Sequence, residues 1–289
     1  MYGYPHRKTL AHRIVWGFSQ WKAAAMSFDR IRRLAGRPYP GRIELAALAA
    51  LYGVYELVRG FGSEDWVAAR AHTSDIVALE RHLHLFIERD VQSFVSSLPG
   101  VASLLGLLYV VLHFAGTAAV LTWVHRRRPH AFPFLRTTLI VSTALALIGY
   151  VLYPAAPPRL AGLGFADTVT THTGLNLSSD LLGSFYNPIA AVPSLHFGYS
   201  LIVGVALAQL AAYRWLRIVG AAYPAAMLLI IVGTGNHFIF DAAAGAVVVA
   251  IGWLIASRLA APALPAPVRL PAPQEAWTPQ SAPSHARAA

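Results

Sequence analysis

The chain has 289 residues, of which 56% are hydrophobic and 12% are charged, and it contains no cysteine. Soluble domains carry about 25% charged residues, so this chain has too few charges for an ordinary water-facing surface. The lack of cysteine excludes disulfides, thiolate metal sites and cysteine nucleophiles. The net charge of +10 does not indicate nucleic-acid binding, because the basic residues cluster at the ends of apolar runs, where they orient membrane helices.

The first 42 residues form a basic arm in which tryptophan and phenylalanine alternate with arginine and lysine. This pattern is typical of a helix that lies at a membrane interface. The arm has no apolar core followed by a cleavage site, so it is not expected to be a signal peptide. We predict a cytoplasmic anchor over residues 1–42.

Six apolar runs approach the length of about 20 residues that a membrane-spanning helix needs. Basic clusters at 125–128 and 213–217 alternate with segments that lack them, which predicts cytoplasmic termini and three outer connections. The fold class is therefore expected to be all-α, a six-helix membrane bundle over residues 43–258. The predicted spans are 43–58, 101–124, 134–153, 193–212, 218–232 and 238–257.

Two segments are predicted to lie outside the membrane on the outer face. Within residues 60–99, apolar residues recur at helical spacing over 76–87, which predicts one amphipathic helix on the surface. Residues 154–189 are rich in glycine and proline and are predicted to be an outer loop over a functional site. The alanine- and proline-rich tail, 259–289, is predicted to be disordered.

Four chemically active residues are predicted to meet at the outer face. Ser194 and His196 lie at the outer start of the fourth span, and His237 lies at the outer start of the sixth. Arg159 follows the outer end of the third span. Since the chain enters through the fourth span and returns through the fifth, all four reach the same side of the membrane.

These residues are suited to phosphoryl transfer through a phosphohistidine. His237 and Asp241 are spaced i, i+4 and share a helix face. The carboxylate can accept the proton of one imidazole nitrogen and leave the other free to attack phosphorus. His196 can protonate the leaving oxygen. Candidates for holding the phosphate oxygens are Ser194, Asn236, Arg159 and the N–H groups at helix starts.

The same residues could alternatively bind a metal ion. His196, His237 and Asp241 could serve as ligands. However, no second carboxylate accompanies them at the outer ends of these spans, and the three roles above already use all three. We therefore predict neither a metal nor a cofactor.

Three further residues are candidates for substrate binding. Tyr109 and His113 share one face of the second span. They either line the substrate cavity or bond to a neighbouring helix. Asn187, with Asp167 and Thr168, is expected to organise the outer loop near the site.

Three motifs resemble the type 2 phosphatidic acid phosphatase superfamily, and more closely its inositol phosphorylceramide synthase branch. They are Tyr-Pro-Ala-Ala-Pro-Pro-Arg at 153–159, Ala-Val-Pro-Ser-Leu-His at 191–196 and Gly-Asn-His-Phe-Ile-Phe-Asp at 235–241. The segment 164–168 and the pair Tyr109 and His113 also look like that branch. The resemblance extends over residues 75–258.

This resemblance implies a six-helix membrane core, no metal, a phosphohistidine intermediate and a lipid-linked phosphoester substrate. It implies that His237 is the nucleophile, Asp241 its orienting group and His196 the general acid, with Ser194 and Arg159 as phosphate ligands. The sequence departs from the phosphatase branch in lacking its lysine–arginine first motif and in having isoleucines at 230–231 where that branch has a Ser-Arg pair.

Arg136 cannot easily replace these missing cations, because the predicted topology places it at the cytoplasmic start of the third span. The phosphate cradle is therefore short of positive charge, which favours the transferase branch over simple phosphatidic acid hydrolysis.

The predicted function is a lipid phosphotransferase or phosphatase that passes a phosphoryl or phospho-headgroup to an acceptor alcohol or to water. Its expected location is a bacterial-type plasma membrane, with the active site on the extracytoplasmic face. The alternative is a non-catalytic lipid carrier or scaffold that uses the polar cluster only to hold a headgroup. Six spans without an evident repeat offer this alternative only modest support, because many carriers contain repeats.

Overall fold

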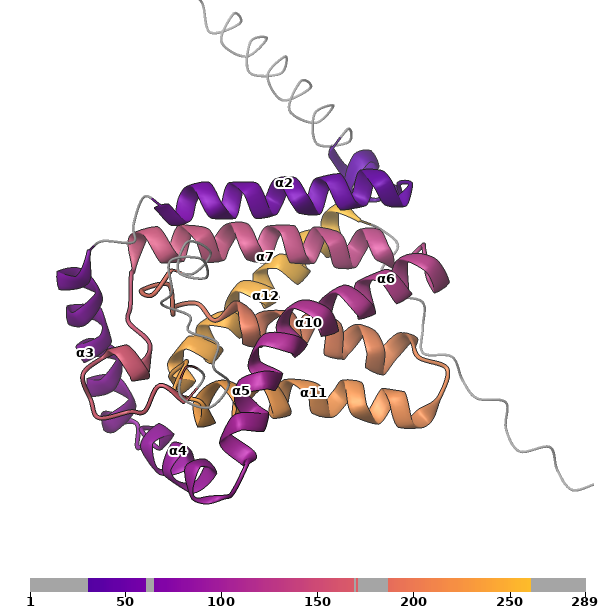
Figure 1. The fold of residues 1–289 in the computed structure, drawn as a ribbon. Helices are drawn as coiled ribbons and strands as arrows, with labels where there is room; N and C mark the ends of the chain where they lie inside the picture. Colours follow the sequence, from indigo (N-terminus) through magenta and orange to yellow (C-terminus); the bar gives the residue numbers. More distant parts are fainter. Residues whose placement is uncertain (1–30, 61–64, 169, 171–186, 261–289) are drawn as a thin grey trace, which may run out of the picture.

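The computed structural model describes residues 31–60, 65–168, 170 and 187–260, and these are helical with irregular connections. Figure 1 shows the arrangement. The helices are α2 (Gly41–Gly60), α3 (Trp66–His82), α4 (Glu88–Ser97), α5 (Val101–Val111), α6 (Thr117–Arg127), α7 (Phe132–Leu152), α10 (Leu195–Leu210), α11 (Arg214–Gly233) and α12 (Ile239–Leu259). A π-helical turn, η1 (Leu112–Gly116), joins α5 to α6, and a 3-10 turn, η2 (Pro158–Leu160), follows α7.

Within the described residues, four helices are long and apolar enough to cross a membrane. They are α7, α11, α12 and the continuous helix Val101–Arg127 that α5, η1 and α6 form together. Of the other two predicted spans, α10 is apolar but has only 16 residues. The 20-residue helix α2 carries Glu44 and Glu56 and is not among the four. The prediction of a membrane-embedded helical bundle is confirmed, and the prediction of spans is confirmed for four of six.

Glycines bring α10 and α11 close together. A Cβ atom on Gly220 of α11 would lie 2.6 Å from the backbone nitrogen of Ala208 and 2.7 Å from the carbonyl oxygen of Gly204 on α10. Small residues allow such close backbone approach in membrane helices, where packing replaces the hydrophobic drive. Helix α2 lies along α7 on the other side of the bundle (Figure 1).

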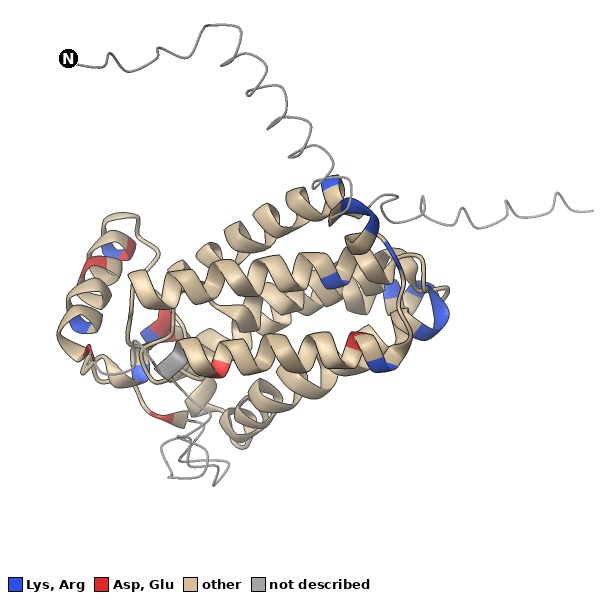
Figure 2. Ribbon diagram, turned by 90° about the horizontal axis from the view of Figure 1, so that it is seen from above, with Lys and Arg blue, Asp and Glu red and all other residues tan. Residues whose placement is uncertain are grey.

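The two ends of the bundle differ in charge. Figure 2 shows Lys and Arg gathered where α6 ends and α11 begins, and we call this the basic end. The opposite end, where α3 and α4 lie, carries charges of both signs, and we call it the site end.

Arg136 lies in the first turn of α7, toward the basic end. Its Nη1 contacts Glu44 Oε1 of α2 at 2.5 Å, with both side chains buried. At 1.5 Å per residue, about 24 Å of α7 separates Arg136 from the site end. Arg136 therefore joins α7 to α2 and does not contribute to a phosphate cradle.

Helices α3 and α4 cover the site end. The predicted single helix over 76–87 is wrong in extent, because α3 ends at His82 and His84 adopts a left-handed backbone angle, φ 57°. A new helix, α4, begins at Glu88. The buried residues of α3 recur at helical spacing and form one face of the helix: Ala69, Thr73, Ile76, Val77 and Glu80.

The described ends of the outer loop are attached to neighbouring segments. The Ala156 N–H donates to Thr73 Oγ1 at 2.9 Å, and Gln92 Nε2 donates to the Ala166 carbonyl at 2.9 Å. Ala155 and Ala190 form an isolated parallel bridge. The predictions for residues 1–30 of the basic arm, 171–186 of the loop and 261–289 of the tail lie outside the described residues.

Candidate active site

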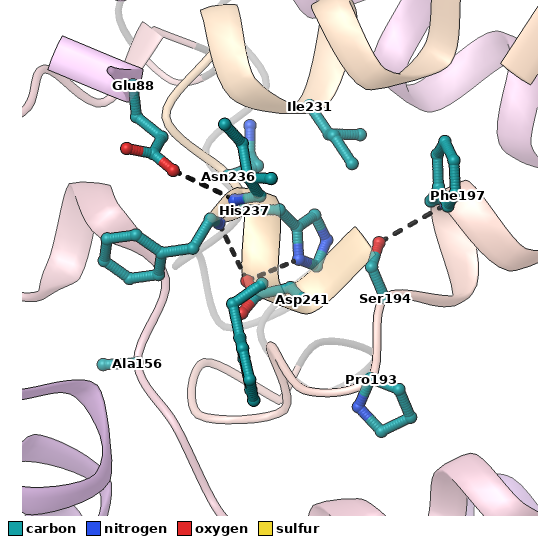
Figure 3. Close-up of polar contacts among 12 residues, drawn as sticks. Glu88, Ala156, Pro193, Ser194, Phe197, Ile231, Asn236, His237 and Asp241 are labelled. Atoms are coloured by element: carbon teal, nitrogen blue, oxygen red, sulfur yellow. Dashed lines mark hydrogen bonds and ion pairs between the residues drawn. The ribbon is translucent and has the colours of Figure 1, made fainter. Parts of the chain in front are cut away.

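The turn between α11 and α12 places His237 beside Asp241. Asp241 is the third residue of α12, and its Oδ2 accepts from the Phe238 N–H at 2.9 Å and contacts His237 Nδ1 at 3.1 Å. Both side chains are buried (Figure 3). An ionised carboxylate only accepts hydrogen bonds, so it places the imidazole proton on Nδ1. The Nε2 lone pair is then available to attack an electrophile.

His196 lies opposite His237 at the start of α10. The two ring centroids are 5.6 Å apart, with the planes tilted by 51°. Tyr109 and His113 both stack on the His196 ring, with centroids 4.1 and 4.0 Å away. Both alternatives left open by the sequence therefore hold, because Tyr109 and His113 line the cavity and also contact a neighbouring helix, α10, where they stack on His196. His113 lies in η1, and π-helical turns frequently occur at functional sites.

Ser194 joins the two helices that carry the histidines. It is the N-cap of α10, where its Oγ accepts from the Phe197 N–H at 3.3 Å. Its own N–H donates to the carbonyl oxygen of Asp241 at 2.9 Å. Gly245 permits this contact, because a Cβ atom there would overlap the Ser194 carbonyl oxygen. With one lone pair used in the cap, the Ser194 hydroxyl proton can still be donated to a phosphate oxygen.

Arg159 reaches the site from η2. Its Nε donates to Asn236 Oδ1 at 2.9 Å, and its Nη1 contacts Asp167 Oδ2 at 3.0 Å. Its backbone N–H donates to the Gly235 carbonyl at 3.0 Å. Asp167 is thus the carboxylate partner of Arg159, while Asp241 is engaged by His237. The motif around Arg159 is held directly against the turn that carries the candidate nucleophile.

A cavity of about 530 Å³ adjoins the histidines. Its polar end is formed by His196, His237, Asn236 and Asn187. Asn187 is buried there, and its Oδ1 accepts from the Ile189 N–H at 3.0 Å. The remainder lies among α2, η1, α6 and α7 and is mainly apolar, with linings that include Leu48, Leu51, Val110, Phe114, Leu121 and Leu139.

Residues 74–255, more than half of the chain, match the family model described as the PAP2 superfamily. The chain belongs to the PAP2 superfamily. Membership supports a lipid enzyme of the phosphatase or phosphotransferase type, in agreement with the apolar spans. No curated protein and no solved structure gives a significant match.

The PAP2 match includes every candidate site residue named from the sequence. It also includes the isoleucines that depart from the phosphatase branch. Ile231 is fully buried, and its carbonyl accepts from the N–H groups of Asn236 at 3.0 Å and His237 at 3.2 Å. At this position the chain therefore uses main chain to shape the turn and supplies no cation.

Two carboxylates near the PAP2 site were missed by the sequence analysis. Glu88 Oε1 accepts from the Ile239 N–H at 3.0 Å, and Glu80 Oε1 accepts from the Phe240 N–H at 2.7 Å. Both glutamates are buried and come from α3 and α4, outside the spans. Glu80 shares a helix face with Ile76 and Val77, and an acid on an apolar face is the signal that could have identified it.

The sequence predicted no second carboxylate at the outer ends of the spans. That prediction does not extend to α3 and α4, which bring Glu80 and Glu88 close to the histidines. Within the ranges that the structure describes, no group of three or more His, Asp or Glu side chains is arranged to hold a metal ion.

Proposed function

We propose that this protein is a membrane lipid phosphotransferase or phosphatase that works through a phosphohistidine at His237. The observation that carries the proposal is the buried His237–Asp241 pair facing His196 at the polar end of an apolar cavity. A nucleophile, its orienting group and an acid are all needed for a two-step phosphoryl transfer.

In the first step, His237 Nε2 attacks the phosphorus atom of the lipid phosphoester. The bond from phosphorus to the leaving oxygen breaks, and His196 donates a proton to that oxygen. Asp241 stabilises the positive charge that forms on the phosphorylated imidazole, because it accepts from Nδ1. In the second step, an acceptor alcohol or water gives its proton to His196 and attacks phosphorus, and the phosphorus–nitrogen bond breaks.

Positive charge for the phosphate oxygens would come from Arg159, which Asn236 and Asp167 orient. The Ser194 hydroxyl would add a neutral donor. These groups supply electrostatic stabilisation without a bound metal, so we propose a metal-independent reaction.

The cavity supports a lipid as the substrate. Its apolar part would take a hydrocarbon chain, while the ester group reaches the histidines at the polar end. The small number of cations favours a phosphodiester with fewer charges than a terminal phosphate, as in the inositol phosphorylceramide synthase branch. An alcohol such as inositol or diacylglycerol would then be the acceptor.

The distribution of charge supports the proposed orientation. The basic end would face the cytoplasm, with the histidines at the extracytoplasmic face of a bacterial-type plasma membrane. The same alternation of basic segments would place both termini in the cytoplasm.

The test is an assay of headgroup release and exchange in reconstituted vesicles that contain a metal chelator. Wild type, His237→Ala and the control His130→Ala, an exposed residue near the basic end, are offered lipid phosphoesters with and without acceptor alcohol. New phospholipid that depends on the acceptor identifies a transferase, and release into water identifies a hydrolase. An acid-labile, base-stable phosphoprotein should form in wild type and in His130→Ala and should be absent from His237→Ala. Equal behaviour of all three proteins on every lipid would favour the carrier alternative.

A further inference from the structure

Three carboxylates from three helices converge on the first turn of α12. The first N–H groups of a helix have no partner within it, and here each of three has its own acceptor. Phe238 donates to Asp241, Ile239 to Glu88 and Phe240 to Glu80. The helix that positions the nucleophile is therefore held from α3 and α4, elements separated from it by about half of the chain.

The two glutamates lack a cation to balance them. Glu80 is 2% exposed and Glu88 is 0% exposed. Of the charged groups nearby, Arg81 lies over the Phe86 ring and Arg89 over the Phe165 ring. Neither glutamate has an ion pair within the described part of the chain. Asp241 adds a third negative group from α12, and His237 lies beside it.

Each glutamate also has one oxygen that the main chain does not use. The Oε2 atoms of Glu80 and Glu88 are buried and receive no donor. If one carboxyl carries a proton, the two side chains hydrogen-bond each other. Two adjacent buried carboxylates resist being charged together, because desolvation and like-charge repulsion both oppose it. One bound proton removes the repulsion and supplies the missing donor.

We propose that Glu80 and Glu88 share one proton and act as positioning residues, bracing the first turn of α12 so that His237 and Asp241 keep their reactive geometry. The positioning role rests on the proposed function. In this arrangement the Oε2 atoms hold each other, and the Oε1 atoms hold the N–H groups of Ile239 and Phe240. Loss of the proton sets two negative charges against each other and loosens α3 and α4 from α12.

The shared proton makes the active site sensitive to alkaline pH. The pKa of Glu80 is raised from 4.5 to about 8, mainly by burial and also by the neighbouring Glu88 and Asp241, while the hydrogen bond from the Phe240 N–H partly opposes the rise. Because this folded-state pKa lies above the unfolded value, the pair's contribution to stability is fully present below the unfolded pKa. It diminishes with rising pH and is lost as pH passes through about 8.

The first test is a pH–rate profile of the vesicle reaction. Wild type should lose activity above pH about 8, at about tenfold per pH unit for a single proton. Glu80→Gln presents an amide that accepts from Phe240 and donates to Glu88 without titrating. It should remove this alkaline decline and remain within about threefold of wild type at neutral pH. Glu80→Ala should lower kcat at least tenfold at every pH with little change in KM.

The matched control is Asp75→Asn, which neutralises an exposed acid on the same helix, α3, and should keep the wild-type profile. Should Glu80→Ala fail to fold, the isosteric Glu80→Gln variant decides the question alone. An unchanged alkaline decline in Glu80→Gln would overturn the proposal, as would full activity of folded Glu80→Ala.

The second test needs no turnover. Infrared difference spectra of wild type and Glu80→Gln should show the C=O stretch of a protonated buried carboxyl in wild type at neutral pH, lost near pH 8. The lack of this band would overturn the shared proton. If wild type turns over no lipid, the proposed function and the positioning role both fail, while the spectrum still decides whether the proton is shared.

Discussion

Replacing Asp241 by asparagine tests the orienting role of the carboxylate directly. In the protein, one oxygen, Oδ2, accepts from both His237 Nδ1 and the Phe238 N–H. Asparagine has one acceptor oxygen and one donor nitrogen. If the asparagine oxygen takes the Oδ2 position, both contacts persist without the charge, and the NH₂ group is buried where Oδ1 receives no donor from the described residues. If the NH₂ group takes the Oδ2 position, it donates to the ring, the imidazole proton moves to Nε2 and the nucleophilic lone pair is lost.

The size of the effect follows from these two contacts. A hydrogen bond to a charged group contributes about 1.5–3 kcal/mol and a neutral one about 0.5–1.5. Loss of charge alone therefore costs about 1–2 kcal/mol, or roughly 5- to 30-fold in rate. The change of tautomer adds to this, and the analogous replacement in a Ser-His-Asp triad lowers kcat by about 10⁴. We expect Asp241→Asn to lower kcat by at least about fivefold through the loss of charge, and by more than about 100-fold where the NH₂ group faces the ring.

KM should change little, because Asp241 does not line the cavity. The assay is a rapid-quench measurement of phosphohistidine formation together with steady-state turnover. Asp90→Asn, an exposed acid on α4, is the control and should behave as wild type. A folded Asp241→Asn protein with kcat within threefold of wild type would refute the argument that this carboxylate sets the tautomer of His237.

Three further outcomes are expected. Arg159→Lys keeps the charge but loses the planar contacts to its neighbours, and kcat/KM should fall about 10²-fold in the vesicle assay. Leu51→Trp narrows the apolar part of the cavity and should raise KM about tenfold for long-chain substrates but not for short-chain ones. Arg136→Gln leaves Glu44 buried without its cation. The variant should lose about 3–5 kcal/mol of stability, seen as a lower Tm of the purified protein.

A specific experimental result would contradict each of these three predictions. Full activity of Arg159→Lys would mean that the guanidinium does not contact the transferred group. Equal KM values for long and short chains in Leu51→Trp would mean that the lipid does not occupy the cavity. An unchanged Tm in Arg136→Gln would mean that the pair with Glu44 does not stabilise the bundle.

The parts of the site that were predicted from sequence depend on local spacing or on simple membrane topology. The i, i+4 spacing predicted the contact between His237 and Asp241, but not its geometry, because His237 lies just before the N-cap Phe238 and is outside α12. The approach of His196 follows from a membrane hairpin, whose return brings the chain back to the same end. Both inferences need only the rise of a helix and the thickness of a bilayer.

The parts that were missed depend on long-range packing. Glu80 and Glu88 contact main-chain groups more than 150 residues away, and no periodicity predicts which helix end they meet. They also lie within residues 60–99, a segment that was predicted only to lie on the outer face. The break at His84 escaped prediction because the apolar spacing continues through it, while the backbone there is left-handed. Glu44 lies near the start of the predicted span 43–58, and its pairing with Arg136 on α7 is likewise a long-range contact.

The hydrogen bond from the Ser194 N–H to the Asp241 carbonyl closes a ring of main chain that runs through α10, α11 and α12. His196 lies two residues after Ser194 on one side of this hydrogen bond, and His237 lies four residues before Asp241 on the other side. A closure made of backbone atoms keeps its spacing whichever lipid-facing side chains surround it. Helix α2, which borders the cavity, lies outside the ring. Movement of α2 would therefore leave this closure intact, so the alignment of the two histidines does not depend on the position of α2.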